Sequence, residues 1–230
     1  MLKRVYHLCK IARKLAASGA ISTINEIYNI PISIQIFFSV FSIGIKAKTE
    51  NSYKKPGEKL CQALEGMGTT FIKLGQFLAT RPDIIGEELT KDLIKLQDKL
   101  PAFGLSQAKR VIEQELGQDQ FQKITNLSES IAAASIAQVH IAQINIDGNN
   151  KNVAIKILRP NIEKLFNEEL DALMLLAYIV ENTISKTKRL KLVEVVHLLK
   201  EITNIEMDLR FEAAAANELY ENTKNDLGFN

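Results

Sequence analysis

The sequence is poor in the residues that mark cross-linked, secreted or metal-binding proteins. Its 230 residues include only two cysteines, Cys9 and Cys61, which lie far apart and form no Cys-x-x-Cys pair. The three histidines are scattered, so neither thiols nor imidazoles predict a metal site. No secretion signal is evident, because Lys10, Arg13 and Lys14 interrupt any apolar leader. These absences favour a reducing compartment.

A hydrophobic run long enough to cross a membrane is also missing. Residues 31–45 (PISIQIFFSVFSIGI) are nearly all apolar, with Gln35 as the only strongly polar residue. These fifteen residues fall short of the roughly 18–20 that a spanning helix needs. The stretch is consistent with a buried core helix, and equally with a segment lying in a membrane interface beside a basic helix.

Charge is nearly balanced overall but unevenly spread. The chain is 46% hydrophobic and 24% charged, which is globular composition, with a net charge of +2. Residues 1–57 hold nine Lys/Arg against two acids, whereas residues 58–230 hold twenty against twenty-five. A basic front end predicts an anionic partner. Because it shows no aromatic-plus-basic pattern, we favour a membrane surface and expect no nucleic acid.

Helical patterns fill the first half of the chain. Apolar residues recur at spacings of three and four, and the pattern breaks near Pro31, before Pro82 and at Pro101. Residues 51–57 are typical of a linker, and Ser106 and Gly117 are typical of a helix cap and a helix stop. The predicted helices span residues 2–17, 22–44 in two parts, 58–81, 87–100 and 106–116.

The pattern changes to strands near residue 131. Residues 139–146 and 153–158 favour strand, and the turn sequence at 147–150 joins them into a predicted hairpin. Two long helices are predicted to follow, at about 161–182 and about 192–222. Because two strands alone are marginally stable, partner strands must come from residues near 121–131 or from further chain. This order predicts an α+β fold with a small antiparallel sheet.

Lys156 ends a Val-Ala-Ile-Lys sequence in the second predicted strand. In kinases, a lysine in this pattern neutralises the α- and β-phosphates of ATP and is held by a helix glutamate. Strands rich in Val and Ile also often end in an exposed lysine, so the pattern alone leaves both interpretations open. The hairpin before it and the acid-bearing helix after it favour the first.

Three acids, Glu206, Asp208 and Glu212, lie within seven positions of the last predicted helix. Asp208 and Glu212 are four apart and share a face, whereas Glu206 points about 200° away from Asp208 in a continuous helix. They fit a solvated face with ion pairs. Apolar residues on all sides, including four consecutive alanines, instead favour a largely packed helix. A packed acid needs a cation, and Lys156 is the candidate.

An alanine-rich turn precedes the hairpin and consists of Ala132, Ala133, Ala134 and Ser135. A kinase has a glycine-rich loop over the phosphates at this place. Alanine removes the positive-φ conformers of glycine, but it keeps the side chains small enough for backbone amides to approach phosphate. The alternative interpretation is a short helical turn.

The sequence Lys73-Leu74-Gly75-Gln76 lies inside the predicted helix at 58–81. Lys73 and Gln76 are three apart and share a face. Gly75 costs about 1 kcal/mol of helix propensity relative to alanine, so its position predicts close packing against another element. Lys73 and Gln76 would then face that element, and Glu206 with Asp208 would be a suitable target.

These pieces, in this order, resemble the UbiB/AarF family of atypical kinases from about residue 58 to residue 217. Residues 73–76 are similar to the family's KxGQ motif, and Ala132–Ser135 with the following IAQVH to its alanine-rich loop. Lys156 resembles the strand lysine, Glu206-x-Asp208 the ExD motif, and Glu212 the helix glutamate that pairs with the lysine. Residues 78–83 and 96–98 are also family-like.

The resemblance implies a role for each of these residues. Lys156 and Glu212 would be the phosphate-binding pair, and Ala132–Ser135 the loop that covers the phosphates of ATP. Lys73 and Gln76 would block the place where a protein substrate would lie, and Glu206 and Asp208 would anchor them there. The family implies binding of ATP and Mg²⁺, atypical kinase or ATPase chemistry without a protein substrate, and support of ubiquinone biosynthesis. Expected partners are an anionic membrane surface or quinone-biosynthesis proteins, at the cytoplasmic face of a bacterial-type inner membrane.

The sequence departs from the family pattern in its last part. It contains no catalytic-loop motif with Asp and Asn, and the Asp-x-Gly at 226–228 follows Glu212 too closely to be the metal-binding motif. We therefore expect a truncated or split protein, or a fragment of an interrupted gene, in which the catalytic base and the Mg²⁺ ligands lie elsewhere. The alternative function is that of a non-catalytic membrane-docking or scaffold module. The predicted organisation is a membrane-associating helical region at 1–57, a KxGQ helical extension at 58–120 and a partial kinase-like N-lobe at 121–230, with the C-lobe absent.

Overall fold

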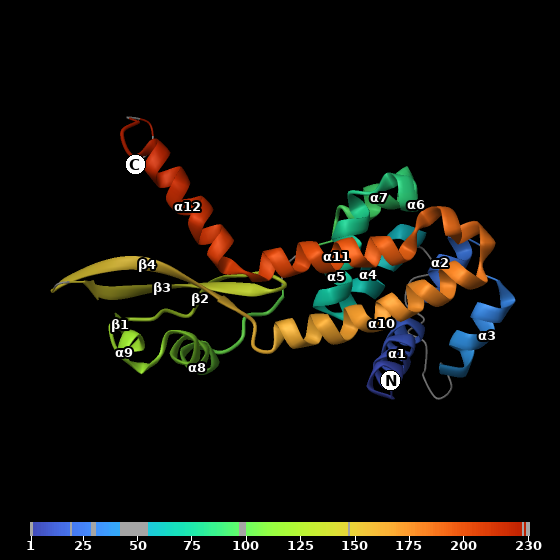
Figure 1. Ribbon diagram of the computed structural model, residues 1–230, viewed down its shortest axis with the longest axis horizontal. Helices are drawn as coiled ribbons and strands as arrows, with labels where there is room; N and C mark the ends of the chain where they lie inside the picture. The colour runs from blue at the N-terminus through green and yellow to red at the C-terminus, as the bar shows by residue number, and fades with distance from the viewer. Residues whose placement is uncertain are drawn as a thin grey trace. The chain divides into compact units, whose positions relative to one another are not determined.

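A computed structural model describes residues 2–18, 20–28, 31–41, 55–96, 100–146, 148–226 and 228. Figure 1 traces the described elements along the chain. In chain order they are α1 (Leu2–Ser18), α2 (Ala20–Tyr28), α3 (Ile32–Phe41), α4 (Pro56–Met67), α5 (Thr69–Ala79), α6 (Pro82–Ile85), α7 (Glu87–Leu93), α8 (Leu105–Leu116), α9 (Gln118–Phe121), β1 (Ile124–Thr125), β2 (Ser130–Ala133), β3 (Ala137–Ile146), β4 (Asn149–Leu158), α10 (Ile162–Thr183), the 3₁₀ helix η1 (Ser185–Leu190), α11 (Leu192–Met207) and α12 (Leu209–Thr223). The predicted mixture of helices and one small antiparallel sheet is confirmed.

The chain folds into two compact units, neither of which is continuous in sequence. The first comprises Met1–Pro101, Ala133–Ser135 and Lys164–Leu199, and the second comprises Ala102–Ala132, Ile136–Glu163 and Lys200–Asn230. The first unit is helical, and the second holds the sheet. None of the described helices is both long enough and apolar enough to cross a membrane.

The first unit is built around α4, which packs against α1, α2, α5 and α7. Its core contains the fully buried side chains of Ile11, Phe71, Ile72, Phe166 and Leu170. The separation of α2 from α3 confirms the predicted break near Pro31. The predicted linker lies partly outside the described residues, and its last two residues, Pro56 and Gly57, begin α4.

A glycine divides the helix that was predicted over residues 58–81. Gly68 has φ of +102°, a left-handed conformation that only glycine adopts at low cost, and it separates α4 from α5. The prediction of one continuous helix is therefore wrong. Hydrophobic spacing runs on unchanged through Gly68, so periodicity gives no sign of the break.

Lys14 joins α1 to the rest of the first unit. Its ammonium lies 2.7 Å from Glu169 Oε1 on α10, donates to the Met67 carbonyl at 3.1 Å, and sits 5.9 Å from the centre of the Phe71 ring. The Glu169 side chain is only 6% exposed. A carboxylate buried to this degree needs a cation, and Lys14 provides it.

In the second unit, β3 is the central strand of a four-stranded sheet. It pairs with β4 along its full length, from Ala137 opposite Leu158 to Ile146 opposite Asn149. Strands β1 and β2 also pair with β3, so they share its other edge. The predicted hairpin is confirmed, and so is the prediction that residues near 121–131 supply partner strands.

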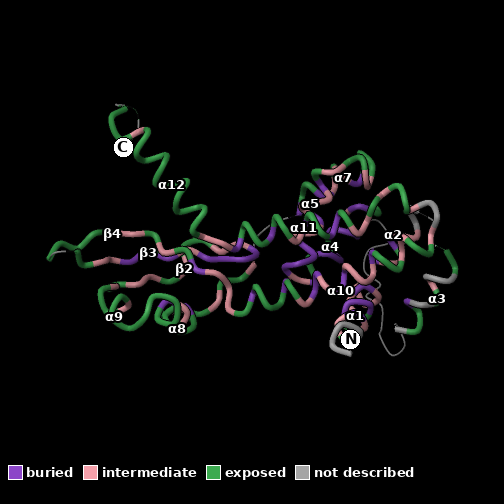
Figure 2. Tube along the Cα trace, in the orientation of Figure 1, coloured by how far each residue is buried: buried purple, intermediate pink, exposed green. Residues whose placement is uncertain are grey.

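The two faces of this sheet differ in burial (Figure 2). One face packs on α8, where Ala108 and Ile112 contact Ile157 and the half-buried Ile155. Because successive residues in a strand point to opposite faces, Ala154 and Lys156 lie on the other face, and both are exposed. We refer to this side of the sheet as the open face and to the side that packs on α8 as the closed face.

Three helix boundaries differ from the prediction. The cap residue of α8 is Gly104 and not Ser106, although Gly117 ends the helix as predicted. The helix predicted over 87–100 ends at Leu93, and residues 97–99 lie outside the described residues. The helix predicted over 161–182 is confirmed as α10, but the one over 192–222 is divided into α11 and α12 at Asp208, which has φ −87° and ψ +88°.

Candidate functional site

Lys156 and Glu212 meet in the second unit. Lys156 is held on the open face of the sheet, with Val139 opposite it across the β3–β4 pair. Its ammonium lies 2.5 Å from Glu212 Oε2 in the first turn of α12. The two residues are 56 positions apart, so the fold alone brings them together. The side chains are 38% and 59% exposed, which leaves the ammonium open to an anionic ligand.

The helix that carries Glu212 is not packed. No residue of α12 is buried, and Phe211, Leu219 and Tyr220 are each at least 60% exposed. The helix projects away from the sheet beyond its first turn (Figures 1 and 2). The expectation of a largely packed helix is therefore wrong. Its alanines make packing possible, but packing needs a partner surface, and the described residues offer none.

Asp208 is the N-cap of α12. Its carboxylate accepts hydrogen bonds from the backbone N–H of Arg210 at 3.1 Å and from the Arg210 guanidinium at 2.7 and 2.5 Å. These bonds from Arg210 hold the pKa of Asp208 below its ordinary value. The sequence analysis did not predict the role of Arg210. The available signal was Asp208 itself, because Asp is a preferred residue at the start of a helix.

Glu206 lies in the last turn of α11 and is exposed. Because Asp208 interrupts the helix, the angle of 200° expected between Glu206 and Asp208 in a continuous helix does not apply. Glu206 instead lies in the last turn of α11, and Asp208 is the residue at which the helix breaks. That break sets their relative orientation by loop geometry and not by helical periodicity.

The alanine-rich segment is part of a strand and its connection, so the helical-turn interpretation is wrong. Ala132 and Ala133 end β2, and Ala134 and Ser135 lead into β3. A connection this short between paired strands requires an antiparallel hairpin. Ser135 is fully buried, and its carbonyl accepts a bond from the Thr69 hydroxyl at 3.4 Å. The loop therefore sits against the start of α5.

Gly75 is buried in α5, as its predicted role in close packing requires. A Cβ placed there would lie 2.3 Å from Leu96 Cδ1 and 2.9 Å from Leu64 Cδ1. The close neighbours of α5 at this glycine are thus Leu64 of α4 and Leu96, which follows α7. Lys73 and Gln76 are both half-buried on the same helix.

The structure thus joins some of the predicted site residues and assigns others to different units. Lys156, Glu212, Glu206 and Asp208 belong to the second unit, and Lys73 and Gln76 to the first. The contact predicted between the KxGQ residues and the ExD acids stays a prediction.

A buried polar network lies on the face of the sheet that packs on α8, and the sequence analysis did not predict it. The Gln138 amide accepts from Phe103 N–H at 2.9 Å and donates to the Phe103 carbonyl at 3.1 Å. Gln138 Nε2 also lies 2.8 Å from His140 Nε2, and His140 Nδ1 lies 2.8 Å from the Ser128 carbonyl. A carbonyl only accepts, so Nδ1 carries the proton and Nε2 accepts from the Gln138 amide. These bonds tie β3 to the segments before α8 and β2.

Comparison with known proteins decides the family. The model of the ABC1 atypical kinase-like domain matches residues 95–230, which is more than half of the chain. The chain belongs to this ABC1 family. Its matched part includes the sheet, Lys156, the ExD acids and Glu212. The recognition of an atypical kinase from the ordered motifs is confirmed.

Curated relatives of this ABC1 protein carry the name "Probable protein kinase UbiB". The protein from Marinobacter nauticus is 35% identical over 206 residues, which cover 89% of this chain and 37% of the relative. Those from Cellvibrio japonicus and Tolumonas auensis are 36% and 38% identical over 170 residues, or 74% of this chain and 30% and 31% of theirs. The chain therefore spans about a third of the length of these relatives.

Proposed function

We propose that this chain forms the nucleotide-binding part of a UbiB-type atypical kinase or ATPase that supports ubiquinone biosynthesis. The Lys156–Glu212 pair carries the proposal. A lysine on an exposed sheet face, held at 2.5 Å by a carboxylate from a separate helix, is oriented to neutralise phosphate charge. Membership of the ABC1 family and the names of the UbiB relatives support the same assignment.

The chemistry of these residues suits the binding of a nucleoside triphosphate. Lys156 would neutralise phosphate oxygens while Glu212 keeps its ammonium in place, and the small side chains of Ala132–Ser135 would let backbone amides approach the phosphates. ATP would supply the phosphoryl group. Lys73 and Gln76, anchored by Glu206 and Asp208, would exclude a protein substrate. Mg²⁺ ligands and the catalytic base are expected in the part of the relatives that this chain does not span, so phosphoryl transfer would need that part as well.

Binding of a fluorescent ATP analogue with Mg²⁺ tests the proposal on the chain itself. Charge-assisted hydrogen bonds contribute about 1.5–3 kcal/mol, so Lys156→Ala is expected to weaken binding about 10- to 100-fold. Glu212→Gln is expected to weaken it less, because the ammonium remains. Lys151→Ala changes an exposed lysine of the same strand, and Glu218→Gln an exposed acid of the same helix. Both controls should bind as the parent does. Equal affinity of the Lys156→Ala variant and the parent would overturn the proposal.

We infer membrane docking as a second function, because α3 exposes an apolar stripe. Ile32, Ile36 and Val40 are spaced by four, so they share one helix face, and they are 73%, 57% and 57% exposed. Lys10 and Arg13 on α1 are exposed in the same unit. Apolar side chains together with basic ones favour an interface with anionic lipid, consistent with a peripheral protein at the cytoplasmic face of an inner membrane.

Flotation with liposomes tests the docking function. The parent is expected to float with anionic vesicles and less with zwitterionic ones, and the double variant Ile36→Asp/Val40→Asp is expected to stay at the bottom. Ile94→Asp is the matched control, since Ile94 is 67% exposed elsewhere in the same unit. Flotation unchanged by the double variant would remove α3 from the docking surface.

A further inference from the structure

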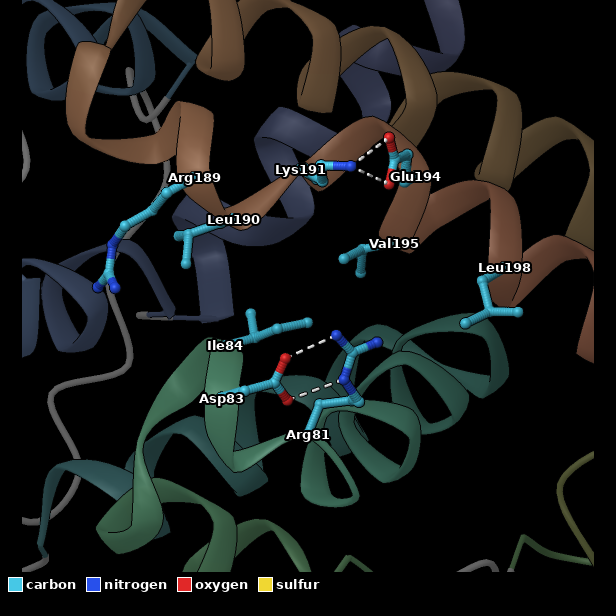
Figure 3. A pocket seen from close by; sticks show the side chains of 9 residues that line it. All are labelled: Arg81, Asp83, Ile84, Arg189, Leu190, Lys191, Glu194, Val195 and Leu198. Atoms are coloured by element: carbon cyan, nitrogen blue, oxygen red, sulfur yellow. Dashed lines mark hydrogen bonds and ion pairs between the residues drawn. The ribbon is translucent and has the colours of Figure 1, made fainter.

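The first unit contains a cavity that none of the proposed nucleotide residues lines. It has a volume of about 380 Å³ and lies between α6 on one side and η1 with the start of α11 on the other (Figure 3). This volume is at the small end of the range of ligand sites, about 300–1,000 Å³.

Part of the lining of this cavity is aliphatic. Ile84 points into it from α6, and Leu190 and Val195 point toward Ile84 from the opposite side (Figure 3). Leu198 continues the same wall along α11 and is 39% exposed. An exposed aliphatic surface inside a concavity favours a ligand with an apolar body.

The rim of the cavity carries charge, and most of it is neutralised in pairs. Arg81 donates from Nε and Nη2 to the two oxygens of Asp83 at 2.8 and 2.7 Å. Lys191 lies 3.1 Å from each carboxylate oxygen of Glu194. The dashed lines in Figure 3 mark these contacts.

Arg189 supplies the remaining positive charge. It is exposed at the edge of the cavity, and no hydrogen bond or ion pair joins it to another described residue. Three cations and two carboxylates line the cavity, so its net charge is +1. A planar guanidinium with free N–H groups matches a carboxylate in a bidentate arrangement.

The backbone at the rim has an uncommon conformation. Lys191 ends η1 with φ of +49°, in the left-handed region that residues other than glycine enter at a cost. The sequence thus keeps a charged side chain at a position where glycine is the usual residue. Conformations of this kind are frequent at ligand sites.

We propose that this cavity binds a monocarboxylic acid with an aliphatic body. The single unbalanced charge matches one carboxylate, which Arg189 would hold, and the four aliphatic side chains would cover the stem. A dianionic phosphate monoester would exceed the local positive charge. The site is independent of the proposed nucleotide site, because it uses none of the same residues.

Calorimetric titration of the chain with acetate, octanoate, decanoate and 1-decanol, all below micelle formation, tests the proposal. Affinity should rise from acetate to decanoate, and decanol should bind at least tenfold more weakly than decanoate. Arg189→Ala is expected to weaken decanoate binding about 10- to 100-fold, as loss of a charge-assisted bond does. Lys188→Ala removes a neighbouring exposed lysine outside the cavity and should leave binding unchanged.

A second variant tests the aliphatic part of the cavity independently of the result for Arg189→Ala. Leu198→Glu places a negative charge at a partly exposed position of the wall and should abolish decanoate binding while the midpoint of thermal unfolding stays close to that of the parent. Three results would overturn the proposal: no saturable binding of decanoate, equal binding of decanol and decanoate, or decanoate binding that survives both Arg189→Ala and Leu198→Glu.

Discussion

Replacing Gly75 by alanine tests how tightly α5 is held against its neighbours. The added methyl group would lie 2.3 Å from Leu96 Cδ1 and 2.9 Å from Leu64 Cδ1, well inside van der Waals contact. These atoms are the ends of flexible side chains, but both leucines are buried, at 6% and 5% exposure. Because interiors are closely packed, turning either buried leucine away would disturb the side chains around it.

The expected size of the effect follows from two opposing contributions. Overpacking a core costs about 1–3 kcal/mol, and alanine regains about 1 kcal/mol of helix propensity. Gly75→Ala should therefore lower the free energy of unfolding by up to about 2 kcal/mol. Gly66→Ala is the matched control, because Gly66 is an exposed glycine of α4 whose added methyl group would meet no described atom within 4 Å. It should stabilise the protein by up to about 1 kcal/mol.

Thermal unfolding followed by circular dichroism measures both variants. For a chain of this size, 1 kcal/mol corresponds to about 2–4 °C in the unfolding midpoint, so Gly75→Ala should melt several degrees below Gly66→Ala. If Gly75→Ala instead raised the midpoint as much as the control, the close packing of α5 on Leu64 and Leu96 would be refuted. The glycine of the KxGQ sequence would then need an explanation outside packing.

Two further predictions concern ionisable groups. Burial, and then the nearby Asp92 carboxylate, raise the pKa of the Cys61 thiol to about 11 from its ordinary 9.0, so its thiolate fraction at mildly alkaline pH falls about a hundredfold. Iodoacetamide should alkylate Cys61 correspondingly slowly in the folded protein, and equal rates in native and urea-unfolded protein would contradict this. Hydrogen bonds from Arg210 lower the pKa of Asp208, so the stabilisation it gives α12 is present above its ordinary pKa of 3.8 and is lost as the pH falls through the lower folded value. Hydrogen exchange of the first-turn amides of α12 should be faster in Asp208→Ala than in the parent at neutral pH, with the difference vanishing in acid.

The sequence predicted the parts of this molecule that depend on local pattern. Alternating Val and Ile residues around a turn predicted the β3–β4 hairpin. The ion pair of Lys156 with Glu212, which the structure contains, was implied by the resemblance to the family. The family was recognisable because several short motifs occur in a fixed order. In each case the signal is a property of neighbouring residues or of their order along the chain.

The features that escaped prediction depend on contacts that no local pattern encodes. Gly68 and Asp208 break helices whose hydrophobic spacing continues across them, so hydrophobic periodicity alone predicts no break at either residue. The bonds of Gln138 and His140 to Phe103 and Ser128 join segments up to 35 residues apart. The exposure of α12 likewise depends on whether a partner surface exists, which composition does not report.

The ion pair of Lys14 has a consequence for how the front end of the protein can be altered. A truncated variant without the basic N-terminal helix α1 is an obvious way to test for membrane binding. Replacing Lys14 alone by alanine would leave the Glu169 carboxylate, 6% exposed, without this cation, at a cost of about 3–5 kcal/mol. Removing the whole helix would also take the buried Ile11 out of the core. A variant lacking α1 would lose fold stability together with any lipid contact, so its failure to bind liposomes would say nothing about membranes. Because α1 is a structural element of the helical unit, only substitutions at its surface can separate a role in lipid binding from its role in the fold.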